Sequence, residues 1–202
     1  MEDRTAIVAR QIEQSIELKR ALITQTHIIL EIAHQMIQAF RRGNKVLLFG
    51  NGGSAADAQH IAGELVGTFY LERDPLPAIA LTTNTSSLTA IANDYGYDQV
   101  FARQLRGLVN KGDIVIGIST SGSSPNVTIA MEEAKRHGAI TIAFTGQGGK
   151  LKEIAEYVLS IPSTDTPRIQ EAHITAGHII AYLVEEALFG ENRPSSKSRS
   201  AR

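Results

Sequence analysis

The chain has 202 residues, of which 43% are hydrophobic and 20% charged, and its net charge at pH 7 is -1. This composition is typical of a single globular domain, and the near-neutral charge gives no reason to expect nucleic-acid or anionic-membrane binding. The lack of cysteine excludes disulfides, thiol nucleophiles and thiolate metal sites. The opening MEDRTAIVAR has no apolar signal-peptide core, and no apolar run approaches the roughly 20 residues of a membrane span, so we expect a cytoplasmic protein.

Two helices are predicted over residues 3–42, because apolar residues such as Ile12 and Ile32 recur there at helical spacing. The stretch RRGN at 41–44 has cations followed by Gly43, which is typical of a helix end. We expect residues 1–44 to form an N-terminal helical pair on a single domain spanning 45–190. The polar, aperiodic residues 191–202 are predicted to be a flexible tail.

Short apolar runs bounded by turn signals alternate with helical patterns through the rest of the chain. The runs are KVLLFG, PAIAL, DIVIGIS, AITIAFT and YVLSIP, and the helices are predicted over 54–68, 86–109, 125–137, about 150–155, and from Thr166, as N-cap, to about 189. This alternation predicts an α/β fold with a five-stranded parallel sheet covered by helices on both faces. Ligands of such sheets bind beyond the carboxyl ends of the strands.

The loop after the first strand reads GNGGSAAD. Ser54 is a candidate N-cap of the next helix, with Asp57 as its capping-box partner. The spacing is not that of a dinucleotide-binding loop or a P-loop.

A second loop, STSGSSPN, follows the third strand. Ser124 is a candidate N-cap with Pro125 at the first helical position, and Ser119, Thr120, Ser121 and Ser123 crowd the space before the helix. A helix N-terminus favours an anion, so the hydroxyls suit a phosphate monoester. The alternative is that a serine-rich turn is only a capped helix start.

His60 and Glu64 are four residues apart on the helix that the first loop opens, so they share a face. The pair can bind a divalent metal or transfer protons, although such pairs are also common surface interactions. In the last helix Gln170 and His178 fall within an arc of about 80° but about 12 Å apart along the axis, and His173 lies on another line. Satisfied core or interface polar groups are the alternative for this second set.

Four stretches together, GNGGSAADAQHIAGEL, LTAIANDYG, GDIVIGISTSGSSPNV and RIQEAHI…H, resemble the sugar isomerase (SIS) domain family over about residues 5–189. Within it the isomerases of sedoheptulose 7-phosphate are most similar. The resemblance implies a flavodoxin-like sheet and a homotetramer that uses the N-terminal helical pair. It implies conversion of sedoheptulose 7-phosphate to D-glycero-D-manno-heptose 7-phosphate through an enediol, zinc-assisted, for surface polysaccharide biosynthesis.

The resemblance also implies roles for individual residues. The zinc ligands would be His60, Glu64, Gln170 and His178, and the catalytic groups Glu64 and His178, which cannot bind metal and act as free bases at the same instant. The substrate-binding residues would be Asn51, Gly52, Gly53, Ser54, Asn93, Asp94, Ser119, Thr120, Ser121, Ser124 and Gln170.

Three positions depart from the family pattern: Thr68, Asn84 and Pro167 stand where arginine, aspartate and aspartate are common. They leave the particular sugar open. A regulator that resembles the DnaA initiator-associating protein, which shares the fold, and a sugar-phosphate sensor remain alternatives, but Glu64 and His178 favour the enzyme. Because Gln170 and His178 lie far apart along one helix, we also expect active sites shared between subunits.

Overall fold

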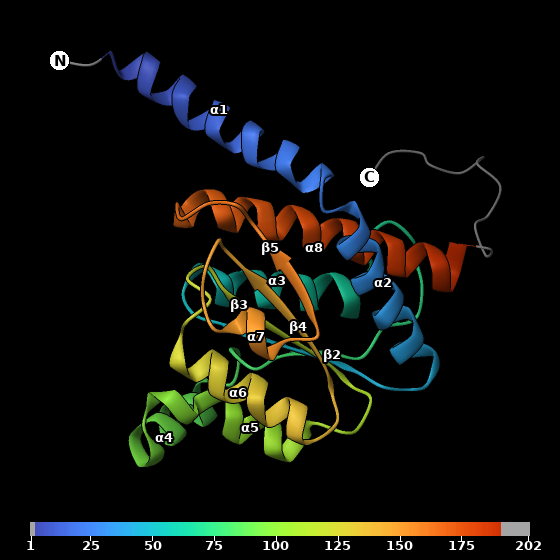
Figure 1. The fold of residues 1–202 in the computed structure, drawn as a ribbon. Helices are drawn as coiled ribbons and strands as arrows, with labels where there is room; N and C mark the ends of the chain where they lie inside the picture. The colour runs from blue at the N-terminus through green and yellow to red at the C-terminus, as the bar shows by residue number, and fades with distance from the viewer. Residues whose placement is uncertain (1–2, 191–202) are drawn as a thin grey trace.

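A five-stranded parallel sheet forms the centre of the molecule, with the strand order β2-β1-β3-β4-β5 (Figure 1). The computed structural model describes residues 3–190, so the predicted tail at 191–202 lies outside the described residues. The elements in chain order are α1 (Arg4–Ile23), α2 (Thr26–Arg41), β1 (Val46–Gly50), α3 (Gly53–Val66), β2 (Ala78–Ala80), α4 (Thr85–Tyr95), the 3-10 helix η1 (Tyr97–Gln99), α5 (Val100–Leu108), β3 (Ile114–Ser119), α6 (Pro125–Arg136), β4 (Ile140–Thr145), α7 (Leu151–Ile154), β5 (Tyr157–Ser160) and α8 (Thr166–Phe189). The predicted fold class is therefore confirmed. Between residues 3 and 190, none of the helices is long and apolar enough to cross a bilayer.

The helix predicted over 86–109 is wrong as a single element. The structure ends α4 at Tyr95, and Gly96 has a φ of 86°, which a continuing helix cannot contain. The 3-10 turn η1 follows, and α5 begins at Val100. The last helix also begins one residue earlier than predicted, because Asp165 is its N-cap residue and Thr166 is already helical.

Strand β1 shows why the strands have continuous apolar sequences. Val46 and Leu48 point into the cluster of side chains on one face of the sheet, whereas Leu47 and Phe49 point into the cluster on the other. All four side chains are fully buried. A strand covered on both faces has no polar side, so its sequence does not alternate.

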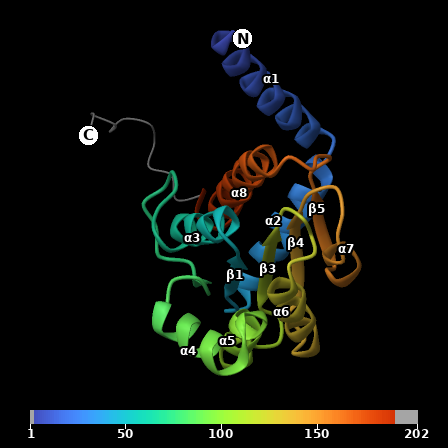
Figure 2. The ribbon, with the colours of Figure 1, turned by 90° about the vertical axis from the view of Figure 1, so that its left-hand side faces the viewer.

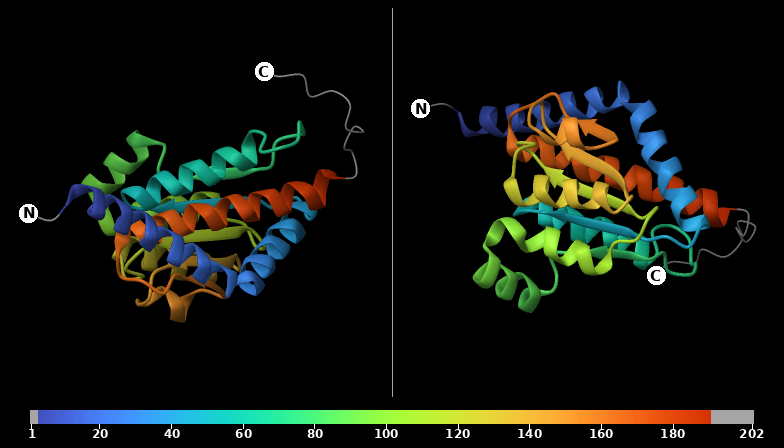
Figure 3. Two further views of the ribbon diagram at one scale, coloured as in Figure 1. Left: turned by 90° about the horizontal axis from the view of Figure 1, so that it is seen from above. Right: turned by 60° about the horizontal axis from the view of Figure 1, so that its bottom comes forward.

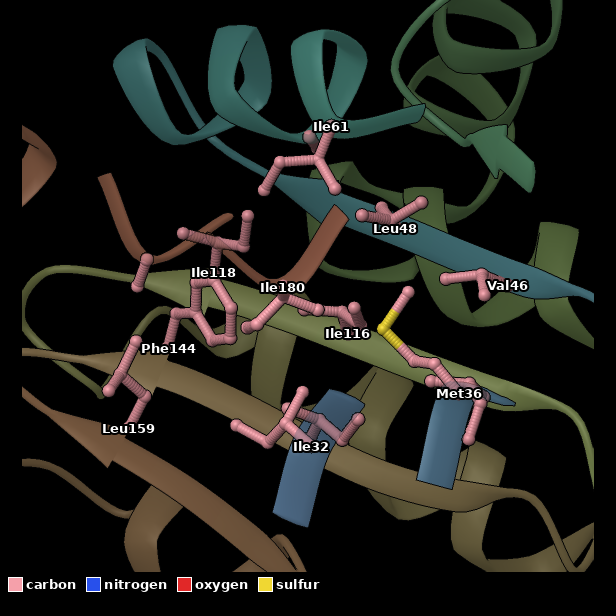
Figure 4. Packing of buried hydrophobic residues seen from close by; sticks show 14 of the residues in the cluster. Ile32, Met36, Val46, Leu48, Ile61, Ile116, Ile118, Phe144, Leu159 and Ile180 are labelled. Atoms are coloured by element: carbon pink, nitrogen blue, oxygen red, sulfur yellow. The ribbon is translucent and has the colours of Figure 1, made fainter. Parts of the chain in front are cut away.

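Helices cover both faces of this sheet (Figure 2). The first face packs against α2, α3 and α8, and Figure 4 shows Ile32 and Met36 of α2 and Ile180 of α8 meeting the strands there. The second face packs against α5, α6 and α7. Helix α1 lies along α8 and extends past the body of the domain, as Figure 1 shows.

The polarity of the strands brings the two predicted loops to one edge. Strands β1 and β3 are parallel neighbours, paired from Val46 with Ile114 to Gly50 with Ile118. The chain leaves β1 toward β2 on one side and leaves β3 toward β4 on the other. Ligands of doubly wound sheets bind where the strand order reverses, so we expect a ligand to bind between the two loops.

His173 lies in the core where α8 crosses β4. Its side chain is fully buried, its Nε2 is 3.2 Å from the Thr145 carbonyl oxygen, and its Nδ1 has no hydrogen-bond partner. Burial lowers the pKa of His173 from 6.5 to about 4, partly opposed by the hydrogen bond to Thr145. His173 is therefore a core histidine, as the alternative interpretation of the sequence proposed for a single histidine here.

Acid is expected to destabilise the fold through His173. As the pH falls below 6.5, the unfolded chain protonates this histidine while the folded one keeps it neutral down to about pH 4. Each unit of pKa difference corresponds to about 1.4 kcal/mol, so up to about 3 kcal/mol of stability is lost across this window.

Replacing His173 by glutamine should flatten the fall of the unfolding temperature between pH 7 and pH 4.5. Thermal melts at a series of pH values measure this, with His34→Gln, an exposed histidine on α2, as the control. If the unfolding temperature fell equally steeply with pH in the His173→Gln variant and the parent, the acid sensitivity could not be assigned to His173.

Candidate active site

An amide pair joins the two loops at the carboxyl edge of the sheet. Asn51 Nδ2 donates to Asn126 Oδ1, and Asn126 Nδ2 donates back to Asn51 Oδ1, each at 2.9 Å. The Tyr97 hydroxyl also reaches Asn51 Oδ1, at 3.3 Å. Asn126 is 2% exposed. Neither Asn126 nor Tyr97 is among the predicted site residues; the only signal for Asn126 was its place at the end of the serine loop.

Helix α3 begins differently from the prediction. Gly52, with a φ of 56°, occupies the N-cap position, and no side chain caps the helix. Ser54 lies instead in the first turn, 3% exposed, with its Cβ packed close to Gly50. The predicted Ser54 cap and Asp57 capping box are therefore wrong, because the glycine turns the chain into the helix before Ser54.

Asp57 lies on the buried side of α3 instead. Its Oδ2 is buried without a hydrogen-bond partner, and burial raises the pKa of Asp57 to about 6, partly offset by nearby His60.

Gly53 makes room for the amide of Gln170. A Cβ at Gly53 would lie 2.3 Å from Gln170 Nε2 and 2.7 Å from Gln170 Oε1. The start of α3 and the N-terminal part of α8 are therefore in direct contact, and the predicted ligand Gln170 is held against the first loop.

We expect Gly53→Ala to displace the Gln170 amide and lower activity by at least about tenfold, the effect typical of a disturbed supporting contact. Because alanine is the better helix former, the free energy of unfolding should change little. Steady-state kinetics and thermal melts measure the two effects separately. Gly63→Ala, on the same helix with open space around its missing Cβ, is the matched control. Full activity in Gly53→Ala would show that the position of Gln170 does not matter.

The serine loop gathers three hydroxyl groups. Ser119 Oγ lies 2.9 Å from Ser124 Oγ and 3.3 Å from Ser121 Oγ. Ser124 is the N-cap residue of α6 and Pro125 follows in the first turn, as predicted, but the Ser124 side chain makes no capping hydrogen bond. Its hydroxyl binds Ser119 instead. The hydroxyls thus precede a twelve-residue helix whose N-terminus favours an anion.

The loop after β4 supports the serine loop from behind. Gly122, with a φ of 66°, approaches so closely that a Cβ would lie 2.3 Å from the Gly148 carbonyl oxygen. Leu151 N donates to the Gly122 carbonyl oxygen at 3.0 Å, and Gly146 N donates to that of Thr120 at 3.1 Å. These contacts require glycine at position 122, so the backbone of the serine loop is fixed.

His60, Glu64 and His178 gather between α3 and α8, which lie side by side in Figure 3. His60 Nε2 lies 3.0 Å from Glu64 Oε1 and 2.9 Å from His178 Nε2. The two helices approach closely because Gly177 has no side chain; a Cβ there would lie 2.7 Å from Ile61 Cδ1.

These three side chains are suited to a divalent metal. Each offers one ligand atom, and the atoms lie within 4.8 Å of one another. Two imidazole nitrogens and one carboxylate oxygen are a donor set typical of zinc, which binds them at about 2.0–2.2 Å. All three come from one chain, so this part of the site needs no second subunit.

The remaining predicted residues lie on α4 and α8 and just after α3. Asn93 Nδ2 donates to Asp94 Oδ1 at 2.8 Å, and both residues are exposed near the end of α4. Asn84 is the N-cap residue of α4, its Oδ1 accepting from Ser87 N. Thr68 is exposed just after α3, and Pro167 lies in the first turn of α8.

Known proteins resemble the chain over nearly its whole length. A family model of the SIS domain matches residues 10–146. The phosphoheptose isomerase of Roseiflexus sp. (strain RS-1) is 55% identical over 189 residues, covering 93% of this chain and 96% of that protein. A solved phosphoheptose isomerase structure from Neisseria gonorrhoeae is 40% identical with a TM-score of 0.86, covering 91% of this chain and 100% of that one. One from Francisella tularensis is 36% identical with a TM-score of 0.88, covering 91% and 99%.

Proposed function

Because this chain belongs to the SIS domain family, among its phosphoheptose isomerases, we propose that it converts sedoheptulose 7-phosphate to D-glycero-D-manno-heptose 7-phosphate. The chain is an isomerase by this membership. The observation that carries the substrate proposal is the end-to-end similarity to proteins of that name, together with a histidine–glutamate–histidine group on helices that begin at the loop edge. We further propose that the enzyme acts in the cytoplasm and supplies heptose for surface polysaccharide.

The phosphate group of the substrate is proposed to bind at the serine loop. Ser119, Ser121 and Ser124 present hydroxyls, and Thr120 lies between them. Hydroxyl groups and the helix N-terminus can bind a phosphate without a lysine or arginine. Asn51, which the amide pair fixes beside this loop, is proposed to bind the sugar, with Gly52, Gly53, Ser54, Asn93 and Asp94 around it.

The metal is proposed to be zinc. His60, Glu64 and His178 would hold it, with Gln170 as a fourth ligand, and when bound it would stabilise negative charge on the substrate oxygens.

Glu64 and His178 are proposed to move the protons. Because neither can be a metal ligand and a free base at the same instant, the group that takes the proton must first leave the metal, or another group acts in its place. A base removes a proton from C1 of the ketose while O2 gains one, and the C1–C2 double bond of the enediol forms. A proton then returns to C2 while O1 loses its proton, which leaves the aldehyde at C1. General acid–base catalysis of this kind contributes about 10²–10⁴ to the rate.

We propose a homotetramer with active sites at the subunit interfaces. Helix α1 supports this, because Val8 and Ile12 on it are 58% and 56% exposed, and a partner chain could bury them. Light scattering at micromolar concentration should give the mass of about four chains. A fully active monomer would overturn the proposed assembly.

An isomerase assay on sedoheptulose 7-phosphate, with metal-free enzyme and after addition of zinc, tests the function. Heptose 7-phosphate formed only with zinc supports the whole proposal. Formation of heptose 7-phosphate without zinc would support the isomerase activity and contradict the proposed role of the metal. Tight binding without turnover would favour the sensor, and neither binding nor turnover would favour the regulator.

A further inference from the structure

A buried carboxylate on the last helix has no part in the chemistry proposed above. Glu185 on α8 is 1% exposed. Its Oε2 accepts hydrogen bonds from Tyr70 N at 2.7 Å and Leu71 N at 3.0 Å, and its Oε1 accepts one from Phe69 N at 3.1 Å. Burial raises the pKa of Glu185, but the hydrogen bonds from these amides and from Arg73 outweigh it, so the net pKa is lowered. The side chain is therefore an ionised anchor for the loop after α3.

Arg73 completes this anchor and ties it to α3. Its Nε donates to Glu185 Oε1 at 2.9 Å, and both side chains are almost fully buried. The other guanidinium nitrogens donate to the carbonyl oxygens of Glu64 and Leu65, each at 2.9 Å. The charge pair thus binds the backbone of Glu64, one of the three residues in the metal group.

The anchored loop also contacts the second helix of the metal group. The Phe69 ring lies against the His178 imidazole, with 5.7 Å between the ring centroids. Tyr70, the next residue, makes an edge contact with Tyr182 one turn further along α8. The hydrogen bonds of Glu185 therefore hold the backbone at Phe69, and the Phe69 ring packs against the His178 imidazole.

We propose that Glu185 is a positioning residue for the metal centre, acting through Arg73 on the backbone of Glu64 and through Phe69 on the imidazole of His178. The proposal rests on the metal site of the proposed function. Groups that orient metal ligands without touching the metal commonly change metal affinity by about 10–100-fold. Substitution of a residue that only stabilised the fold would leave the zinc affinity of the folded protein unchanged.

Zinc titration of the metal-free protein by calorimetry tests the proposal, with the parent chain measured first. Glu185→Gln keeps the shape, removes the charge, and turns an NH2 group toward backbone N–H donors. Its zinc affinity should fall about 10–100-fold.

Asp113→Asn is the matched control. Asp113 is also 1% exposed and accepts hydrogen bonds from the backbone N–H groups of Lys45 and Asn110, but it lies just before β3, at the opposite edge of the sheet. This variant should lose stability yet bind zinc like the parent.

Phe69→Leu changes the contact with His178 without disturbing the buried carboxylate of Glu185. Its zinc affinity therefore tests the proposal if Glu185→Gln does not fold. This substitution should also weaken zinc binding, and the double variant should show less than the sum of the two effects. Parent-like zinc affinity in Glu185→Gln, or in Phe69→Leu where the first does not fold, would overturn the proposal. Equal weakening in Asp113→Asn would overturn it too. If the parent chain bound no zinc, the proposed metal site would be wrong, and the positioning role of Glu185 would be wrong with it.

Discussion

Glu64→Gln is expected to abolish turnover while leaving the binding of the phosphate ester nearly intact. Glutamine keeps the size of the side chain but can neither take up a proton nor supply the negative charge that pairs with His60 and a metal. Loss of general acid–base catalysis alone lowers kcat by about 10²–10⁴-fold. The phosphate end should still bind, because the serine loop is held by contacts to the loop after β4 that Glu64 does not touch.

Steady-state kinetics and calorimetry with sedoheptulose 7-phosphate measure the two effects. Glu31→Gln, an exposed glutamate on α2, controls for the change of charge. Parent-like turnover in Glu64→Gln would remove this residue from the mechanism and favour the sensor or the regulator.

The double variant Ser121→Ala, Ser124→Ala should raise KM by about 10²-fold or more with a smaller effect on kcat. A hydrogen bond to a charged group contributes about 1.5–3 kcal/mol, and two are removed. The loss of stability should be modest, about 1 kcal/mol, because Ser124 makes no capping bond. The variant loses the contact between Ser119 and Ser124 and two longer contacts of Ser121, each at 3.3 Å, with Ser119 Oγ and Ser123 N.

Ser123→Ala is the matched control within the same loop. Its hydroxyl makes only a 3.5 Å contact with the Ser121 carbonyl oxygen, so its removal should leave KM unchanged. If KM of the double variant equals that of the parent, the phosphate binds elsewhere.

The sequence predicted the sheet well because burial on both faces leaves a clear local signal. Each of the five apolar runs became a strand, and the chain order of strands and helices was enough to define a parallel sheet. The errors were local: one was a single residue at the start of α8, where Asp165 is the N-cap residue, and two others involve glycine. Gly52 and Gly96 adopt positive φ values, and they shifted the start of α3 and divided the helix predicted over 86–109.

The site was harder to predict because its contacts join distant residues. His173 and His178 are five residues apart, about 140° around the helix, so they face different surroundings. Helix spacing alone could not tell which one meets His60 and which enters the core beside Thr145; only the resemblance to the SIS family singled out His178. Nor could it predict the ion pair of Glu185 with Arg73, since two adjacent glutamates stand at 185 and 186 and only the packing of α8 selects one.

Helix α8 also determines the order in which parts of this protein can fold during synthesis on the ribosome. It closes the first core cluster with Ile169, Ala172, Ala176, Ile180 and Val184. It also receives α1, since Arg168 Nη1 donates to the Gln11 carbonyl oxygen across 157 residues of sequence at 2.6 Å.

The first helix of the chain therefore has no docking surface until the last one has been synthesised. The part of the first sheet face that α8 covers stays exposed until then, so the nascent chain presents apolar surface that chaperones bind. His60 and Glu64 likewise wait for His178, so a metal ion can be captured by the full group only after synthesis is nearly complete.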